Sequence, residues 1–69
     1  MMLTPDDHHA LTRLARYGVL RVGNGTDCVL RSVARKFHLT GYARQRAMDG
    51  RQYLELTPKG RVMALRTAT

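Results

Sequence analysis

The stretch TDCVLRSVARKF, residues 26–37, decides the fold. Four apolar residues in it recur at i, i+3, i+4 and i+7, the spacing that aligns side chains along one face of an α-helix. These are Leu30, Val33, Ala34 and Phe37. The residues that point the other way are polar and mostly cationic, namely Arg31, Ser32, Arg35 and Lys36. We therefore predict a helix over about residues 26–37, packed on one side and basic on the other.

The first residues of this stretch suit the start of a helix. Thr26 is a good N-cap, because its hydroxyl can accept a hydrogen bond from an unpaired N–H of the first turn. Asp27 suits the positive end of the helix dipole and stands four residues before Arg31, the spacing of a helical ion pair. Most helices with a charged outer face are simply solvated, so the functional interpretation depends on the rest of the chain.

The charge balance is the most informative bulk property. The chain has twelve Lys and Arg residues and five Asp and Glu, which gives a net charge of +7. Ten of the twelve basic residues are arginine. The guanidinium fork of arginine matches phosphates and guanine edges bidentately. Residues 31–51 contain six basic residues and one acidic residue. Such a balance indicates nucleic acid first, and an anionic membrane or an acidic protein second.

The length of the chain allows one domain with a thin core. A chain of 69 residues buries only about 60% of its unfolded surface, and dimerisation is a common remedy at this size, so a homodimer is expected. No apolar run approaches a membrane span, and MMLTPDDHH does not have the shape of a signal peptide. The single cysteine fits a reducing compartment. We expect a cytoplasmic protein that does not enter a membrane.

The segment before the basic helix predicts a helix and a short strand. Thr4-Pro5 offers an N-cap and a first helical residue, and Asp7 can complete a capping box. We predict a helix over about residues 5–17, ended by Gly18. A brief strand over about 19–22 and a Gly-Asn-Gly turn follow. The turn lacks the Gly-Lys-Ser/Thr of a nucleotide-binding loop, so such a loop is not expected.

After the basic helix the pattern alternates, as in a β-hairpin. Asp49-Gly50 is typical of a two-residue type I′ turn, so we predict a hairpin over about residues 39–56. The opposed pairs are then Arg46 with Tyr53 and Arg44 with Glu55, the latter a cross-strand ion pair. Leu54 and Leu56 would face the core.

Three arginines of this hairpin, Arg44, Arg46 and Arg51, would lie toward its tip. Solubility and protection of a strand edge are the plainer explanation of their presence. Thr57-Pro58 then repeats the helix-start signal of Thr4-Pro5, and we predict a short helix over about residues 58–66. Its Val62 and Leu65 would face inward. Its outward residues would be Lys59, Arg61 and Arg66.

The order helix, short strand, basic helix, hairpin and helix resembles an α+β winged-helix DNA-binding domain. The closest likeness is YLELTPKGR, residues 53–61, which is similar to the end of the wing in MarR- and PadR-type bacterial repressors. VLRSVARK, residues 29–36, resembles their recognition helix. The resemblance covers about residues 26–66. It implies that the basic helix enters the major groove and that the hairpin, as the wing, reaches the neighbouring backbone.

Carried over by position, the resemblance implies DNA contacts for Arg31, Ser32, Arg35 and Lys36 on the helix and for Arg44, Arg46 and Arg51 on the wing. The sequence departs from the family where a helix-turn-helix has a helix directly before the recognition helix. Either the domain is a trimmed version, or residues 18–25 contain a turn of helix. The long dimerisation helix of the full repressors is also lacking.

Other kinds of site are not indicated. Cys28 would lie near Arg31, where a thiolate is stabilised, but a half-buried structural cysteine is the more common case. The three histidines do not have the spacing of metal ligands, and no residues suggest catalysis, so no metal, cofactor or enzymatic activity is expected. The tyrosines could stack on bases, although packing is their commoner use.

The leading hypothesis is a small transcriptional regulator of bacterial or phage type that binds double-stranded DNA. It requires the basic residues of the helix and of the hairpin to converge on one side of the molecule. The alternative is a winged-helix interaction module, such as a mobile-element inhibitor of a host protein, which binds an acidic partner through the same basic face.

Overall fold

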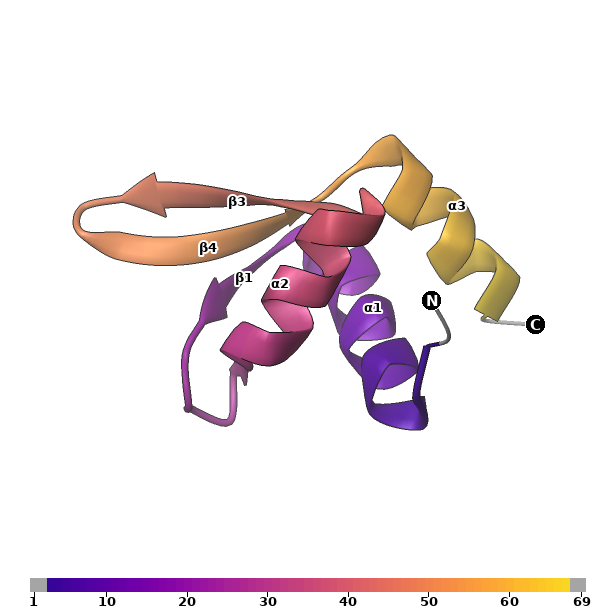
Figure 1. The fold of residues 1–69 in the computed structure, drawn as a ribbon, viewed down its shortest axis with the longest axis horizontal. Helices are drawn as coiled ribbons and strands as arrows, with labels where there is room; N and C mark the ends of the chain where they lie inside the picture. The colour runs from indigo at the N-terminus through magenta and orange to yellow at the C-terminus, as the bar shows by residue number, and fades with distance from the viewer. Residues whose placement is uncertain (1–2, 68–69) are drawn as a thin grey trace.

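The computed structural model describes residues 3–67, which form three α-helices and one four-stranded sheet (Figure 1). The elements are α1 (Pro5–Tyr17), β1 (Val19–Val22), β2 (Cys28–Val29), α2 (Arg31–Thr40), β3 (Ala43–Met48), β4 (Arg51–Leu56) and α3 (Pro58–Thr67). The hairpin of β3 and β4 extends to one end of the molecule, and α3 lies at the other (Figure 1). The predicted α+β class is confirmed.

Helix α1 begins as its sequence predicts. The Thr4 hydroxyl accepts a hydrogen bond from the N–H of Asp7 at 3.2 Å, and the Asp7 carboxylate accepts one from the N–H of Thr4 at 2.9 Å. This reciprocal pair is the capping box, and Pro5 follows the cap. The helix ends at Gly18, whose N–H donates to the carbonyl of Leu14. The prediction for residues 5–17 is therefore confirmed.

Helix α2 begins at Arg31, later than the predicted start at about residue 26. Cys28 and Val29 form β2 and pair in parallel with β1, and Val29 is buried beside Val22. Burial of this β-branched side chain in the sheet outweighs an extra helical turn. Thr26 is therefore not the N-cap, and its carbonyl instead accepts a hydrogen bond from Arg13 at 3.3 Å. Leu30 takes the cap position, where it is exposed rather than packed.

The later start removes one further expected feature, and the segment before it settles an open alternative. Asp27 lies outside the helix, so it forms no helical ion pair with Arg31. Residues 19–22 form the predicted strand and residues 23–27 form bends and turns. Residues 18–25 therefore contain no turn of helix, and within residues 3–67 no helix other than α1 precedes α2.

The hairpin has the predicted turn and register but starts later. Asp49 and Gly50 both have positive φ, 53° and 75°, as a type I′ turn requires. The opposed pairs include Arg44 with Glu55 and Arg46 with Tyr53, as predicted. The first strand begins at Ala43 rather than at residue 39, because α2 continues through residue 40. Leu39 consequently lies on the helix, where it is exposed.

The core lies on one face of the sheet. The strand order is β2-β1-β4-β3, with β1 antiparallel to β4. Leu20 pairs with Leu54 across these two strands, and both are buried where α1 packs against β1 and β4, while α2 packs against β3. The core consists of Ala10, Leu11, Leu14, Leu20, Val29, Ala34, Phe37, Ala43, Leu54 and Ala64. Leu54 is fully buried and Leu56 packs partly against the core, as expected for the inward side of the hairpin.

Helix α3 starts as predicted but packs through a different face. The Thr57 hydroxyl accepts from the N–H of Gly60 at 3.1 Å, as a cap should. Val62 and Leu65, predicted to face inward, are 53% and 66% exposed. The inward residues include Gly60 and Ala64. A Cβ at Gly60 would lie 1.9 Å from the Tyr42 carbonyl oxygen, so this close approach of two backbones sets the packed face.

Candidate nucleic-acid interface

Helix α2 presents a basic face to solvent. Ala34 and Phe37 are buried and Val33 is half-buried, which fixes the packed side of the helix. Arg31, Ser32, Arg35 and His38 are exposed on the remaining surface. The first turn of the helix holds no acidic residue. Three of the four predicted contact residues of this helix therefore lie where a ligand can reach them.

A groove separates this face of α2 from the hairpin. It has a volume of about 350 Å³ and is lined by Val22, Arg31, Arg35, His38, Leu39, Gln45 and Gln52. Gln45 and Gln52 reach the groove because their strands alternate, so that both share the inner face of the hairpin with Leu54. The groove thus combines cationic side chains from the helix with amide side chains from the hairpin.

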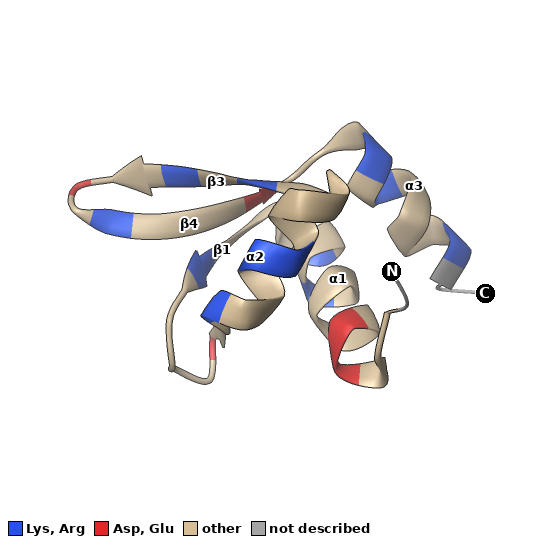
Figure 2. Ribbon diagram, viewed as in Figure 1, with Lys and Arg blue, Asp and Glu red and all other residues tan. Residues whose placement is uncertain are grey.

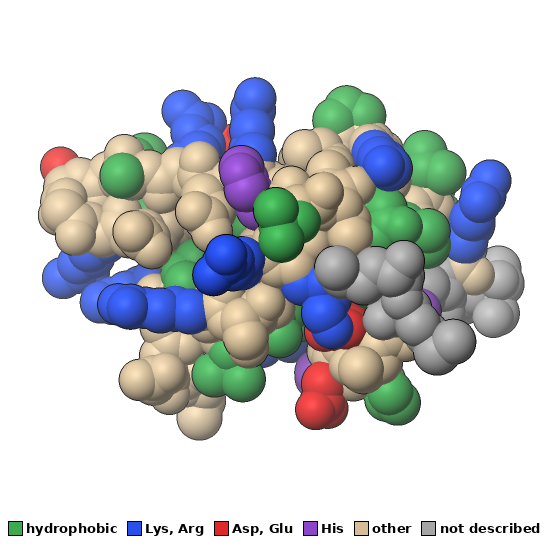
Figure 3. All heavy atoms as spheres, viewed as in Figure 1, with side chains coloured by type: hydrophobic (Ala, Val, Ile, Leu, Met, Phe, Trp, Pro, Cys, Tyr) green, Lys and Arg blue, Asp and Glu red, His purple; other side chains and the backbone are tan. Residues whose placement is uncertain are grey.

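A second hollow adjoins the groove at the N-terminal end of α2. It is lined by Arg21, Val22, Arg31, Gly50, Arg51 and Gln52, and it shares Val22, Arg31 and Gln52 with the groove. Figure 2 shows Lys and Arg positions on α2, β1 and the hairpin, and Figure 3 shows basic side chains gathered over these elements. We call the two hollows together the α2–hairpin groove.

The α2–hairpin groove contains no carboxylate. Its charged residues are Arg21, Arg31, Arg35 and Arg51. Within residues 3–67, none of these four forms an ion pair with an acidic side chain. The positive potential of the groove is therefore not cancelled locally, as a polyanion site requires.

Lys36 is directed away from this groove. Its Nζ lies 2.6 Å from a carboxylate oxygen of Asp7, which is only 2% exposed. Burial raises the pKa of Asp7, but hydrogen bonds from Lys36 and from the backbone and hydroxyl of Thr4 outweigh it and leave the pKa below its ordinary value. Lys36 therefore joins α2 to the start of α1.

Two hairpin arginines lie on the opposite face of the sheet. Arg44 donates to Glu55 at 2.7 Å and Arg46 donates to the other oxygen of the same carboxylate at 2.8 Å. These hydrogen bonds, the one from Arg44 foremost, hold the pKa of Glu55 below its usual range. The register pairs Arg44 with Glu55 and Arg46 with Tyr53, so both lie on the face opposite Leu54, and neither of them lines the groove.

The predicted site residues are thus brought together only in part. Arg31, Ser32 and Arg35 are exposed on α2, and Arg51 lines the same groove as two of them. Lys36, Arg44 and Arg46 point elsewhere and are ion-paired. The full convergence that the sequence hypothesis requires is therefore not observed.

Four polar groove residues were missed by the sequence interpretation: Arg21, His38, Gln45 and Gln52. The hairpin register was available from the Asp49-Gly50 turn, so the two glutamines could have been placed on its inner face. His38 could not have been assigned to the groove, because the predicted helix ended at Phe37. Arg21 could not have been assigned either, because its position depends on how β1 joins the sheet.

Other candidate sites gain no support. Within residues 3–67, no three His, Cys, Asp or Glu side chains are grouped so as to hold a metal ion. Cys28 is half-buried and its sulfur lies beside the backbone of Gly23 and Gly25. None of the helices in this part of the chain combines the length and apolar character that a membrane crossing needs. Comparison of the chain with protein-family models, curated proteins and solved structures found no match.

Proposed function

We propose that this chain is a small winged-helix protein that binds double-stranded DNA and acts as a transcriptional regulator of bacterial or phage type. In this assignment α2 is the recognition helix and the hairpin of β3 and β4 is the wing. The topology supports it, since β1, which precedes the recognition helix in the chain, pairs with β4 and so adds a strand to the hairpin. The likeness of residues 53–61 to a wing end supports the same assignment.

The observation that carries the proposal is the composition of the α2–hairpin groove. It offers four unpaired arginines, two glutamines and no carboxylate between an exposed helix and an extended hairpin. A major groove about 12 Å wide admits an α-helix. Arginine pairs bidentately with guanine and glutamine with adenine, so the groove carries the side chains that direct base readout uses.

The residues divide by position into two roles. Arg31 and Arg35 stand on the exposed helix face, where they would reach base edges, whereas the exposed Ser32 lines a separate hollow with Asp7 and Lys36. Arg21 and Arg51 flank that face from the sheet and would contact phosphates. Lys36 is assigned no DNA contact, because Asp7 holds its ammonium group. The ion-paired Arg44 and Arg46 are likewise outside this contact set.

A titration of labelled duplex DNA tests the proposal. A randomised duplex pool is first enriched by selection on the protein, and binding of an enriched sequence is then followed by fluorescence anisotropy at two salt concentrations. If the four groove arginines all meet phosphates, the log–log salt slope is about −3 to −4. Contacts to bases make it shallower and add sequence preference.

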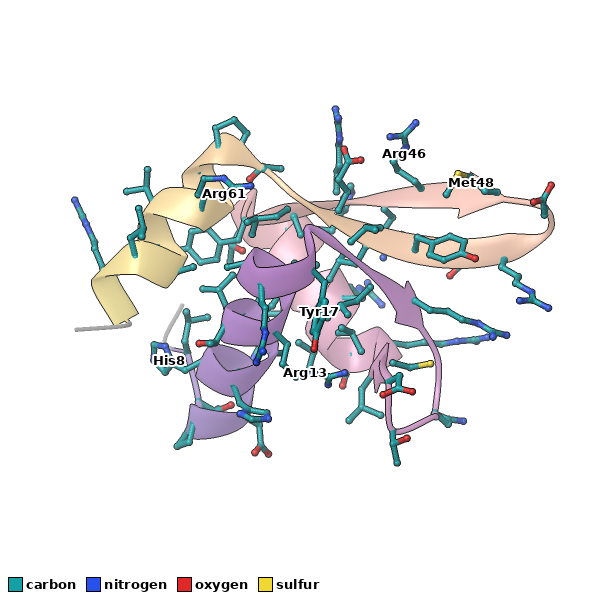
Figure 4. The ribbon with its side chains drawn as sticks, turned by 180° about the vertical axis from the view of Figure 1, so that it is seen from behind. His8, Arg13, Tyr17, Arg46, Met48 and Arg61 are labelled. Carbon is teal, nitrogen blue, oxygen red and sulfur yellow. The ribbon has the colours of Figure 1, made fainter. Side chains whose placement is uncertain are left out.

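Two variants of equal charge make the test specific to the groove. Arg35→Ala should weaken binding of the selected duplex by about 1–3 kcal/mol. Arg61→Ala removes the same charge from the start of α3, at the other end of the molecule (Figure 4), and should change binding little. Equal losses from both variants would show that net charge alone attracts the DNA, and would reject the proposal.

A second candidate function is supported by the lack of a bracing helix. Within residues 3–67 only strands and turns lie between α1 and α2, so α2 has less support against a DNA backbone than a helix-turn-helix provides. The basic groove would then bind an acidic protein. A pull-down from nuclease-treated lysate separates the two candidates. A stoichiometric protein that survives nuclease supports this one, and co-purified nucleic acid supports the first.

A further inference from the structure

The face of the sheet opposite the core carries a second set of polar and aromatic residues. Alternation places on it the strand residues that do not share a face with Leu20 and Leu54. These are Val19, Arg21, Arg44, Arg46, Met48, Arg51, Tyr53 and Glu55. Within residues 3–67 the helices pack against the other face, where the buried strand residues lie. We call this surface the open sheet face.

The central row of the open sheet face is an aromatic ring between two cations. Tyr53 on β4 pairs with Arg21 on β1 and with Arg46 on β3. Side chains directly opposite in an antiparallel sheet have Cβ atoms about 4.5–5.5 Å apart. Tyr53 is half-buried, while Arg21 and Arg46 are exposed on either side of it. The row therefore places one aromatic ring between two guanidinium groups.

The acidic residue on this face is already neutralised. Glu55 accepts hydrogen bonds from both Arg44 and Arg46, one on each carboxylate oxygen. Two arginines share this single carboxylate, so the cluster keeps one excess positive charge. Arg21 adds another, because it has no acidic partner within residues 3–67. An approaching polyanion therefore meets a net positive surface.

A cleft continues this surface toward α1. It has a volume of about 580 Å³ and is lined by His9, Arg13, Tyr17, Val19, Leu20, Arg21, Thr26 and Asp27. Tyr17 is 62% exposed, and Figure 4 shows it with Arg13 on α1 beside β1. Val19 and Arg21 belong both to the cleft and to the open sheet face. The cleft thus places the exposed ring of Tyr17 beside two residues of the open sheet face, Val19 and Arg21.

We propose that the open sheet face binds single-stranded nucleic acid. An unpaired base would stack on Tyr53, with its flanking phosphates on Arg21 and Arg46, and a neighbouring base would reach Tyr17. Aromatic rings that stack bases, set in a positive surface that follows the backbone, are the usual chemistry of single-strand binding. An acidic protein would be attracted by the same arginines, so polyglutamate is the competitor that separates it from a nucleic acid. This surface shares Arg21 and Arg51 with the α2–hairpin groove and is otherwise distinct from it.

Binding of labelled (dT)20 and (U)20 to the full chain, measured by fluorescence anisotropy, tests this proposal. Tyr53→Leu keeps an apolar side chain but removes the ring, and should weaken binding of both oligonucleotides about tenfold. Tyr53→Phe keeps the ring and should bind as the unchanged chain does. Binding should also alter tyrosine fluorescence, because the chain has three tyrosines and no tryptophan. Thermal unfolding by circular dichroism shows that each variant is folded.

The α2–hairpin groove supplies the control that separates this proposal from the proposed function. Arg35→Ala should weaken duplex binding and leave (dT)20 binding unchanged, whereas Tyr53→Leu should do the reverse. If folded Tyr53→Leu binds (dT)20 as tightly as the unchanged chain, the proposal is overturned. It is also overturned if Arg35→Ala abolishes (dT)20 binding, or if polyglutamate of equal charge competes as well as (dT)20 does.

Discussion

Replacement of Gly60 by alanine tests the packing that places α3. A Cβ at this position would lie 1.9 Å from the Tyr42 carbonyl oxygen and 2.8 Å from a methyl carbon of Leu56. Ordinary contact begins at 3.4 Å, so backbone must move by about 1.5 Å, the difference between 3.4 and 1.9. The same carbonyl accepts the N–H of Thr57 at 3.1 Å, so the movement also strains this hydrogen bond.

The expected loss of stability follows from three contributions. Overpacking that shifts backbone costs about 1–3 kcal/mol, and a lost hydrogen bond costs about 0.5–1.5 kcal/mol. Alanine recovers about 1 kcal/mol, because it is the better helix former. These contributions sum to about 0.5–3.5 kcal/mol, and the required movement of backbone places Gly60→Ala in the upper half of that range, at about 2–3.5 kcal/mol. For a chain of this size that corresponds to a fall in Tm of about 10–20 °C.

Urea and thermal unfolding followed by far-UV circular dichroism measure this difference. Gly23→Ala is the matched control, because a Cβ there would lie 3.6 Å from the Cys28 sulfur, an ordinary contact. The control should change the free energy of unfolding by less than about 1 kcal/mol. If Gly60→Ala is as stable as the unchanged chain, α3 does not pack against Tyr42 through this glycine, and the inward face assigned to α3 is wrong.

Three further outcomes are expected. Asp7→Asn should lower the free energy of unfolding at neutral pH by about 1.5–3 kcal/mol, because it removes a charged partner of Lys36. The folded-state pKa of Asp7 lies below its unfolded value of about 3.9, so its contribution is complete above that pH and is lost as the pH falls through the folded pKa. Acid titrations of the two chains, followed by circular dichroism, should therefore converge, and parallel curves would contradict the assignment. Arg35→Lys keeps the charge of the groove but not the bidentate fork, so competition among duplexes should show reduced sequence preference with non-specific affinity retained. An unaltered preference would exclude Arg35 from base readout. Glu55→Gln frees two arginines on the open sheet face, so (dT)20 should bind more tightly, most of all at low salt. Weaker or unchanged binding in anisotropy titrations would show that (dT)20 does not bind at the open sheet face.

Local sequence signals predicted the parts of the fold that local chemistry decides. The capping box of Thr4 and Asp7 and the Asp49-Gly50 turn each depend on residues within four positions, and both are present. The start of α2 was wrong because Cys28 and Val29 pair with β1, a partner that helical periodicity does not reveal. The start of the hairpin was placed too early because α2 continues through residue 40.

The candidate site was less predictable than the fold, because the ion-pair partner of a charged residue can lie far from it in the sequence. Lys36 fits the basic face by spacing alone, yet Asp7, 29 residues away, holds its ammonium group. Arg44 was correctly paired with Glu55, but the sharing of this carboxylate with Arg46 depends on side-chain reach across the strands. Spacing therefore locates basic residues, whereas the fold decides which of them remain available to a ligand.

The hairpin is anchored at its base and unsupported beyond it. Ala43 and Leu54 are buried there, whereas residues 46–52 are all exposed. The outer half is held by the β3–β4 hydrogen bonds and by the turn, so the free energy of local opening is lower there than at the base. Its amide hydrogens should exchange with solvent sooner than those near Leu54. The outer arm can then bend to follow the contour of a bound partner while the anchored base keeps its alignment with α2.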